Sequence, residues 1–134
     1  MSSKPRFGAR VHKYHAKPQW ICTECGEQHS SKRPLCSTCK TETLQHFASK
    51  GEAGRYQELR LALLAGAITD LELHPRYPLK VYGAHVAIYE ADFRYKDGSG
   101  KTIIEDFKGV QTPVFKIKRK LLEALYDVKL TLVK

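Results

Sequence analysis

The sequence predicts an α+β protein in which a small cysteine-rich module precedes a larger domain. Two observations predict this class: all cysteines lie in one short stretch, and helical and strand-like hydrophobic patterns alternate after it. The chain has 134 residues, 42% of them hydrophobic and 28% charged, which is the balance of a folded, soluble protein. It contains neither an apolar run of about 18 residues nor a secretory signal. We therefore expect a cytoplasmic protein that does not enter a membrane.

The charge of the chain is strongly positive. Its 23 Lys and Arg residues outnumber its 14 Asp and Glu residues, which gives a formal net charge of +9. Such an excess suits a polyanion, most commonly nucleic acid, although it can also serve only to keep a protein soluble. Residues 1–19 contain basic side chains, no acidic ones and no apolar period, so they are expected to form a flexible basic arm.

Residues 20–48 are expected to form a zinc-ribbon module and its connector. The cysteines form two C-x-x-C pairs: Cys22, Cys25, Cys36 and Cys39. Four thiolates held on two tight turns suit a closed, structural Zn²⁺ site. A disulfide fits a reducing compartment poorly, and an iron–sulfur cluster usually has a different spacing. Between the pairs, Lys32 and Arg33 either contact phosphates or belong to a solvated loop.

A helix is expected at the start of the larger domain, residues 49–134. Ser49 and Glu52 have the spacing of a capping box, and Gly66 is a typical C-terminal stop. The apolar residues that recur at helical intervals are Tyr56, Leu59, Leu63 and Leu64. Glu52 lies on the same side as most of them and is expected to face the sheet, whereas Glu58 falls outside that stripe and is expected to be solvated.

Strand patterns follow this helix. Leu71 and Leu73 alternate with polar neighbours, which suggests a short edge strand. Residues 81–95 are expected to form a hairpin around Gly83, with one long strand from residue 85 to 95. A turn at 96–100 then leads into a strand over 102–108.

The C-terminal part predicts a second helix and a closing strand. Pro113 suits the first helical position, and the pattern continues to about Tyr126. Candidate buried residues of this helix are Phe115, Leu121, Leu122 and Leu125. Residues 127–133 alternate like a strand. The predicted order within the larger domain is therefore helix, three strands, helix, strand.

A cluster of charged residues falls on the predicted strands. Asp106 and Lys108 project from one face of their strand, while Phe107 points to the other. If this strand pairs with the preceding one through the turn, Asp92 lies beside Asp106. Neighbouring carboxylates favour a hard divalent cation such as Mg²⁺ or Mn²⁺. A nearby lysine can then act on the attacking water or on a phosphate, although an isolated D-x-K is also consistent with an ordinary ion pair.

This arrangement, in which Asp92 precedes Asp106-Phe107-Lys108, resembles the core of the PD-(D/E)XK nuclease superfamily over roughly residues 49–134. It looks like a compact phage and prophage branch, similar in element order to Holliday-junction resolvases. It departs from the superfamily pattern because no Pro-Asp precedes the triplet. The resemblance implies a restriction-endonuclease-like core with a mixed sheet.

The resemblance also implies roles for particular residues. Asp92, Asp106 and the carbonyl of Phe107 would bind the catalytic metal, and Lys108 would position or activate the water. The helical acid of such enzymes maps to Glu52, which could instead be only a helix cap. If the strand carries a bulge, the runner-up ligand is Glu105, which otherwise projects from the opposite face. Candidate nucleic-acid contacts, some of which could be merely solvated, are Gln111, Lys116, Lys118, Arg119 and Lys120.

By this resemblance, the expected activity is Mg²⁺- or Mn²⁺-dependent endonucleolytic hydrolysis of DNA phosphodiester bonds. Branched DNA in phage recombination or processing is the candidate substrate, and the symmetry of a four-way junction suits a homodimer. Two alternatives stay open: a non-catalytic zinc-ribbon protein that binds DNA or acts as an adaptor, and a nuclease of the same fold that acts on RNA.

Overall fold

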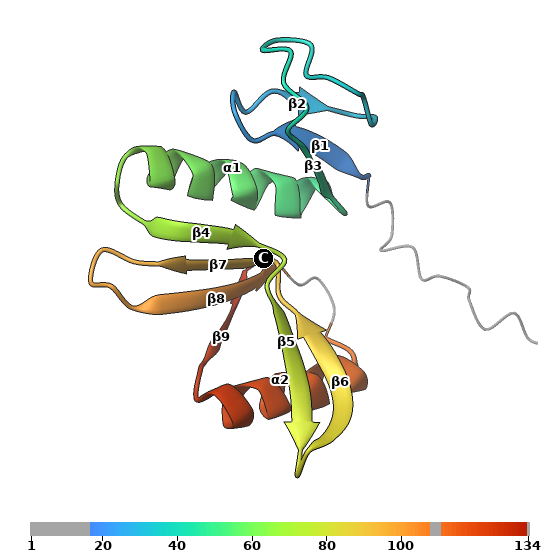
Figure 1. The fold of residues 1–134 in the computed structure, drawn as a ribbon, viewed down its shortest axis with the longest axis vertical. Helices are drawn as coiled ribbons and strands as arrows, with labels where there is room; N and C mark the ends of the chain where they lie inside the picture. Colours follow the sequence, from blue (N-terminus) through green and yellow to red (C-terminus); the bar gives the residue numbers. More distant parts are fainter. Residues whose placement is uncertain (1–16, 108–110, 134) are drawn as a thin grey trace, which may run out of the picture. The chain divides into compact units, whose positions relative to one another are not determined.

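The computed structural model describes residues 17–107 and 111–133 (Figure 1). The chain divides into two compact units, Met1–Gly54 and Arg55–Lys134. The elements in chain order are β1 (Gln19–Cys22), β2 (Gln28–His29), β3 (Leu44–Phe47), α1 (Lys50–Leu64), β4 (Thr69–Leu73), β5 (Arg76–Val81), β6 (Ala84–Glu90), β7 (Phe93–Lys96), β8 (Thr102–Phe107), α2 (Pro113–Tyr126) and β9 (Leu130–Val133). Neither helix of the described ranges is long and apolar enough to span a membrane.

The first unit contains a three-stranded antiparallel sheet in the order β2-β1-β3. β3 lies in the connector that we expected at the end of residues 20–48. This segment is a strand, since its Phe47 is fully buried and pairs with Gln19 of β1. Gln19 is therefore part of the sheet and not of the predicted basic arm. Residues 1–16 of that arm lie outside the described residues.

The second unit contains a four-stranded sheet in the order β4-β7-β8-β9. β4, β7 and β8 are antiparallel, whereas β9 runs parallel to β8. The sheet is therefore mixed, and the α+β class is confirmed. β4 lies at the sheet edge, as its pattern predicted.

The expected long strand over residues 85–95 is wrong. It is two strands, because the backbone changes partner between Ala91 and Asp92. The amide of Ala91 donates to the carbonyl of Pro75 at 3.0 Å, whereas the amide of Asp92 donates to the carbonyl of Glu105 at 3.1 Å. β6 therefore pairs only with β5 in a separate hairpin, while β7 joins the larger sheet. In consequence, five strands rather than three lie between α1 and α2 in the part of the chain that the structure describes.

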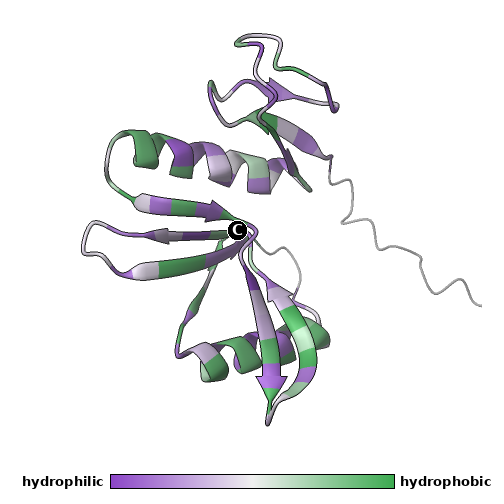
Figure 2. Cartoon of the chain, in the orientation of Figure 1, coloured by the Kyte–Doolittle hydropathy of each residue, from purple (hydrophilic) through white to green (hydrophobic). Residues whose placement is uncertain are grey.

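Burial on α1 follows the prediction only in its first turns. Tyr56 and Leu59 are buried, but Leu63 is 39% exposed and Leu64 is more exposed still. Figure 2 shows hydrophilic and hydrophobic residues interleaved along this helix. The apolar stripe of α1 is thus shorter than the sequence pattern suggested, since its last turn extends beyond the buried part of the helix.

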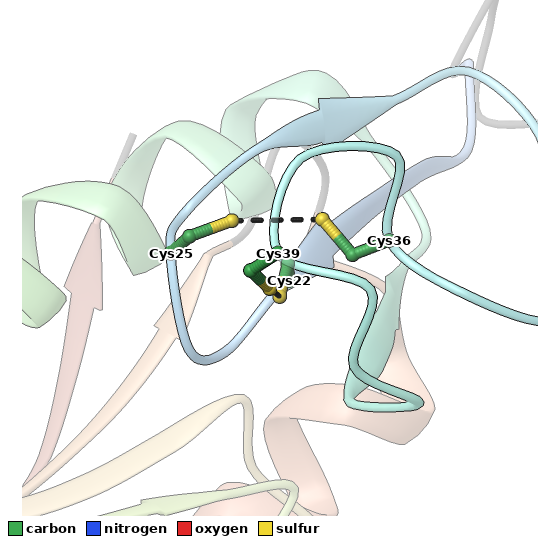
Figure 3. A group of neighbouring side chains, drawn as sticks. All are labelled: Cys22, Cys25, Cys36 and Cys39. Carbon is green, nitrogen blue, oxygen red and sulfur yellow. Dashed lines mark hydrogen bonds between the residues drawn. The ribbon is translucent and has the colours of Figure 1, made fainter.

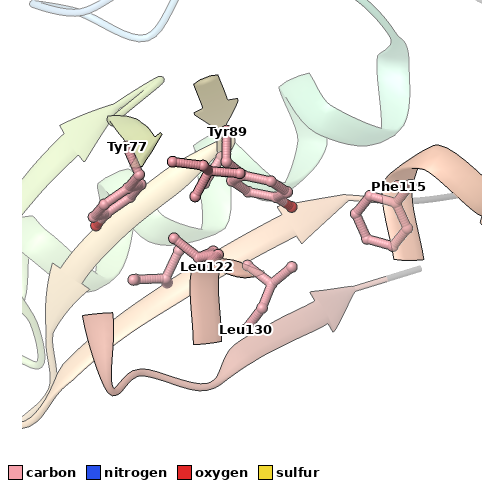
Figure 4. Close-up of a cluster of buried hydrophobic side chains, with 8 residues drawn as sticks. Tyr77, Tyr89, Phe115, Leu122 and Leu130 are labelled. Atoms are coloured by element: carbon pink, nitrogen blue, oxygen red, sulfur yellow. The ribbon is translucent and has the colours of Figure 1, made fainter. Parts of the chain in front are cut away.

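The apolar core of the second unit lies between α2, the hairpin and the sheet (Figure 4). Its buried members are Tyr77, Leu79, Tyr89, Ala91, Ile104, Phe115, Leu122 and Leu130. α2 has the predicted bounds, because the Thr112 side chain accepts a hydrogen bond from the Phe115 amide and Asp127 ends the helix in the left-handed conformation. Leu125 is 44% exposed, contrary to expectation, since it faces the open surface beside Pro78 rather than the core.

Candidate functional site

The four cysteines of the first unit converge on one point, as their spacing predicted (Figure 3). Their sulfur atoms all lie within 4.8 Å of one another. The Sγ–Sγ distance is 3.5 Å both between Cys22 and Cys39 and between Cys25 and Cys36. Tetrahedral Zn–S bonds of about 2.3 Å imply sulfur separations of roughly 3.8 Å, so the cluster has nearly the size that zinc requires.

Two similar turns hold these thiols in place. In the first, the amide of Gly26 donates to the carbonyl of Cys22 at 2.8 Å, and in the second the amide of Lys40 donates to the carbonyl of Cys36 at 3.0 Å. Gly26 and Lys40 both have positive φ, of 79° and 61°. The chain therefore reverses sharply after each pair, so that the cysteines of both turns face a common point.

The surroundings of Cys22 favour the thiolate that a metal requires. Burial alone would raise its pKa, but hydrogen bonds with the Thr41 and Thr43 hydroxyls and with nearby backbone amides lower the pKa of Cys22 to about 5. For Cys25, the backbone amide of Glu27 favours the thiolate, but burial and the neighbouring thiols raise its pKa to about 12. The four close sulfurs and the hydrogen bonds that favour the Cys22 thiolate are those of a site that could bind a structural zinc ion.

The carboxylates that the sequence singled out come together in the second unit. Asp92 immediately precedes β7, and its backbone amide donates to the carbonyl of Glu105, the residue before Asp106 on β8, at 3.1 Å. The Asp92 side chain is fixed toward the end of β8, because its Oδ2 accepts a hydrogen bond of 2.7 Å from the Phe107 amide. Asp92 is therefore bonded to both residues that flank Asp106 in β8.

Asp106 is buried, with 1% of its surface exposed. Its Oδ2 accepts a short hydrogen bond from the hydroxyl of Tyr89, a residue of β6. Burial and then this hydrogen bond raise the pKa of Tyr89 far above its ordinary value, and the charges of Asp106 and Asp92 act in the same direction. The tyrosine therefore keeps its proton and holds one oxygen of Asp106 in a fixed orientation.

Glu105 points away from Asp106 and forms hydrogen bonds with a different set of residues. Both of its oxygens bind Arg55 of α1, at 2.9 Å and 2.6 Å, and one also accepts a short hydrogen bond from Tyr95. Burial and then this bond raise the pKa of Tyr95 to about 12, while Glu105 raises that of Arg55. Glu105 therefore belongs to a buried ion pair that ties α1 to the sheet.

The two acids of α1 differ as expected. Glu52 lies in the first turn, is 3% exposed, and has its backbone amide capped by the Ser49 hydroxyl at 3.2 Å. The side chain of Glu58 is 69% exposed and forms an ion pair with Arg55 at 2.8 Å. Because it is buried, Glu52 stays a candidate for the site, whereas Glu58 is a solvated surface residue.

The basic candidates have different surroundings. Lys108 lies outside the described residues, so the position of the predicted lysine is not part of the described site. The exposed candidates are Lys32, Arg33, Gln111, Lys116 and Lys120, whereas Lys118 and Arg119 are half-buried. The ammonium group of Lys32 lies 5.9 Å from the centre of the Trp20 ring. Arg119 is already bound to Glu123 at 2.9 Å and to the carbonyl of Leu130 at 3.3 Å.

Sequence reasoning missed two neighbours of the carboxylates, Tyr89 and His74. Leu73 of β4 pairs with Phe93, so His74 follows opposite Asp92, and its amide donates to the Asp92 carbonyl at 2.9 Å. A ring nitrogen of His74 and a carboxylate oxygen of Asp92 lie within 4.8 Å of each other. The sequence had no local signal for either neighbour, because pairing between distant strands creates both contacts.

A family model described as "Protein of unknown function (DUF1064)" matches residues 40–134. The chain belongs to the DUF1064 family. The part that matches DUF1064 includes Glu52, Asp92 and the Asp106-Phe107-Lys108 triplet, but none of the four cysteines. Searches of curated proteins and of solved structures found no match to the chain.

Proposed function

We propose that this protein is a divalent-metal-dependent endonuclease with a restriction-endonuclease-like core. In this proposal, Asp92, Asp106 and the carbonyl of Phe107 bind the ion. The single observation that carries it is that Asp92 is hydrogen-bonded to both neighbours of Asp106, Glu105 and Phe107, with a lysine two positions after Asp106 in the sequence. The charges of Asp92 and Asp106 both act on Tyr89, and neighbouring carboxylates repel each other unless a cation joins them.

The chemistry follows from the residues around this pair. A bound Mg²⁺ or Mn²⁺ would polarise a phosphodiester and lower the pKa of an attacking water. Lys108 is assigned to orient that water or to neutralise the charge that develops on the phosphate. The water would lose a proton as its oxygen bonds to phosphorus, and the ester oxygen would leave with the electrons of the broken P–O bond and take up a proton. Tyr89 supports this step by holding Asp106 in place.

Glu52 is assigned as the helical acid of the site. Its burial in the first turn of α1 supports this role, whereas the exposed Glu58 has the surroundings of a surface residue. His74, which lies next to Asp92, offers a nitrogen donor. Mn²⁺ accepts such a donor more readily than Mg²⁺ does, so both ions should be assayed. The assignment of Glu52 can be tested alongside that of the two aspartates.

DNA is the proposed substrate, and branched DNA is the preferred form of it. The net charge of +9 and the exposed lysines of α2 support binding to a phosphate backbone. A homodimer that cuts symmetric junctions is part of the same proposal. Offering single-stranded DNA, duplex DNA, four-way junctions and RNA side by side identifies the substrate.

The test is cleavage by the zinc-loaded full chain with Mg²⁺ or Mn²⁺ added or omitted. Omission is better than chelation here, because a chelator would also remove zinc. We expect Asp92→Asn, Asp106→Asn and Lys108→Ala each to lower the cleavage rate by about 10³-fold or more while DNA binding persists. Glu58→Gln is the matched control, since it removes an acid from the exposed side of α1. Cleavage that survives Asp106→Asn would end the nuclease assignment.

A non-catalytic DNA-binding role is the second candidate. It is favoured by one observation: the hydroxyl of Tyr89 already binds Asp106, so the carboxylate has a partner without any metal. Under this alternative, no metal produces cleavage of any substrate, and Asp106→Asn changes folding stability rather than activity. The same assay therefore separates the two candidates.

A further inference from the structure

The tip of the β5–β6 hairpin carries an exposed aromatic ring, that of Tyr82. Its relative exposure of 106% is the highest among the large apolar side chains in the described parts of the chain. Tyr82 and Gly83 both have positive φ, of 49° and 80°, as in a two-residue type I′ turn. Such turns favour Asn at the first position, and a bulky residue there is strained. The turn itself therefore gives no reason for an aromatic residue.

The hairpin holds this ring on a rigid support. Near its base, the rings of Tyr77 and Tyr126 pack edge to face with their centres 5.0 Å apart. The hydroxyl of Tyr126 also donates to the carbonyl of Pro78 at 2.8 Å, so α2 is fastened to β5. The backbone that carries Tyr82 is therefore anchored, so that only the side chain has to be ordered when it binds a partner.

The charge around the tip is positive. The sequence has no acidic residue between Arg76 and Glu90, which form an ion pair at the base of the hairpin. Near the tip, Lys80 pairs across the strands with His85, and both are exposed. An aromatic ring near an exposed lysine suits a base together with its phosphate.

We propose that Tyr82 stacks on an unpaired base of the DNA substrate, so that the hairpin recognises distorted rather than regular duplex. This inference rests on the proposed nuclease function. Bases in a regular duplex are already stacked on their neighbours. An inserted ring therefore gains the most stacking energy where a base is unpaired or easily unstacked. Lys80 and His85 contact the phosphate backbone of the DNA strand that carries this base.

The hairpin also sets a distance between this contact and the proposed cleavage site. Tyr89, whose hydroxyl binds Asp106, lies seven positions after Tyr82 in the sequence. An extended segment of that length spans about 23 Å, since strands rise about 3.3 Å per residue. At about 3.4 Å per nucleotide, the cut falls roughly seven nucleotides from the distortion.

The test compares binding of the zinc-loaded full chain to two DNA duplexes, one fully paired and one with a bulge of unpaired 2-aminopurine. Tyr82→Asn is the decisive variant, because Asn suits a type I′ turn and keeps the hairpin folded. We expect it to weaken binding to the bulged duplex roughly 5- to 150-fold and to abolish quenching of 2-aminopurine fluorescence. Tyr82→Phe should retain both, and Val86→Ala, which removes an exposed apolar group elsewhere on β6, should change neither.

Three outcomes would overturn the inference. One is unchanged affinity of Tyr82→Asn for the bulged duplex, and another is an equal loss on both duplexes. The third is a change in oligomeric state, which would make the tip a contact between copies of the chain. Metal-dependent cleavage of the bulged duplex by the wild type, and its loss in Asp106→Asn, tests the nuclease proposal, whereas the binding of Tyr82→Asn tests this inference, so the two failures can be told apart.

Discussion

The two units of this chain use polar residues in opposite ways. In the first unit, Cys22 and Cys36 are completely buried and form much of the core together with Ile21 and Phe47. The second unit has a larger apolar core, and its carboxylates lie where β7 and β8 end. We therefore expect the small module to depend on its cysteine cluster, and on a metal bound there, to fold, whereas the larger unit can carry a polar site on a fold that other contacts maintain.

The largest effect should come from loss of zinc. Cys36→Ser removes one of the four sulfur ligands, and structural zinc sites of this kind contribute on the order of 10 kcal/mol to folding. We expect the first unit to lose its structure. Trp20, which is the single tryptophan and packs against His46, should report this through its fluorescence.

The control for this prediction is Ser37→Ala, a change at the exposed residue next to the ligand. It should bind one zinc per chain with unchanged fluorescence. If Cys36→Ser kept both the zinc and the native Trp20 signal, the contrast between the two units would be wrong.

An intermediate effect is expected in the core of the second unit. Leu122 is fully buried, so Leu122→Ala should lower the free energy of unfolding of this unit by about 2–5 kcal/mol. Leu125→Ala, one turn along the same helix, should cost well under half as much because that side chain is largely exposed. Denaturant unfolding measures both, and zinc content should stay constant in both. Equal losses would show that the core has been placed incorrectly.

The smallest effect concerns the ion pair between Arg119 and Glu123 on α2. The hydrogen bond from Arg119 lowers the pKa of Glu123 below its usual 4.5, so this carboxylate stabilises the fold above that pH and loses its contribution as the pH falls through the lowered value. Glu123→Gln should therefore cost about 0.5 kcal/mol at pH 7, and the difference from wild type should shrink below pH 4.5. A difference that grew in acid would contradict this assignment.

Local signals in the sequence predicted the elements whose ends depend on nearby residues. The bounds of α2 were predictable because Thr112 and Pro113 fit a helix start. Ser49 caps α1 as its spacing to Glu52 suggested, and the two C-x-x-C pairs were sufficient to predict the cysteine cluster.

Features that depend on distant pairing were not predictable. The change of partner at Ala91 and Asp92 needs Pro75 on one side and Glu105 on the other, so the pattern over residues 85–95 read as one continuous strand. The contact of Tyr89 with Asp106 likewise joins two strands of different sheets. Alternation did predict that Asp106 and Glu105 have different surroundings, because that depends only on neighbouring positions.

The turn between β7 and β8 restricts how many residues can join the two strands more than it restricts which residues they are. Asp97 accepts hydrogen bonds from the amides of Ser99 and Lys101 and so fixes how many residues join the strands. Shifting β8 by one position would exchange the surroundings of Glu105 and Asp106, leaving Arg55 without its buried carboxylate. Insertions and deletions of a single residue should therefore be far rarer here among natural homologues than substitutions at exposed positions such as Ser99.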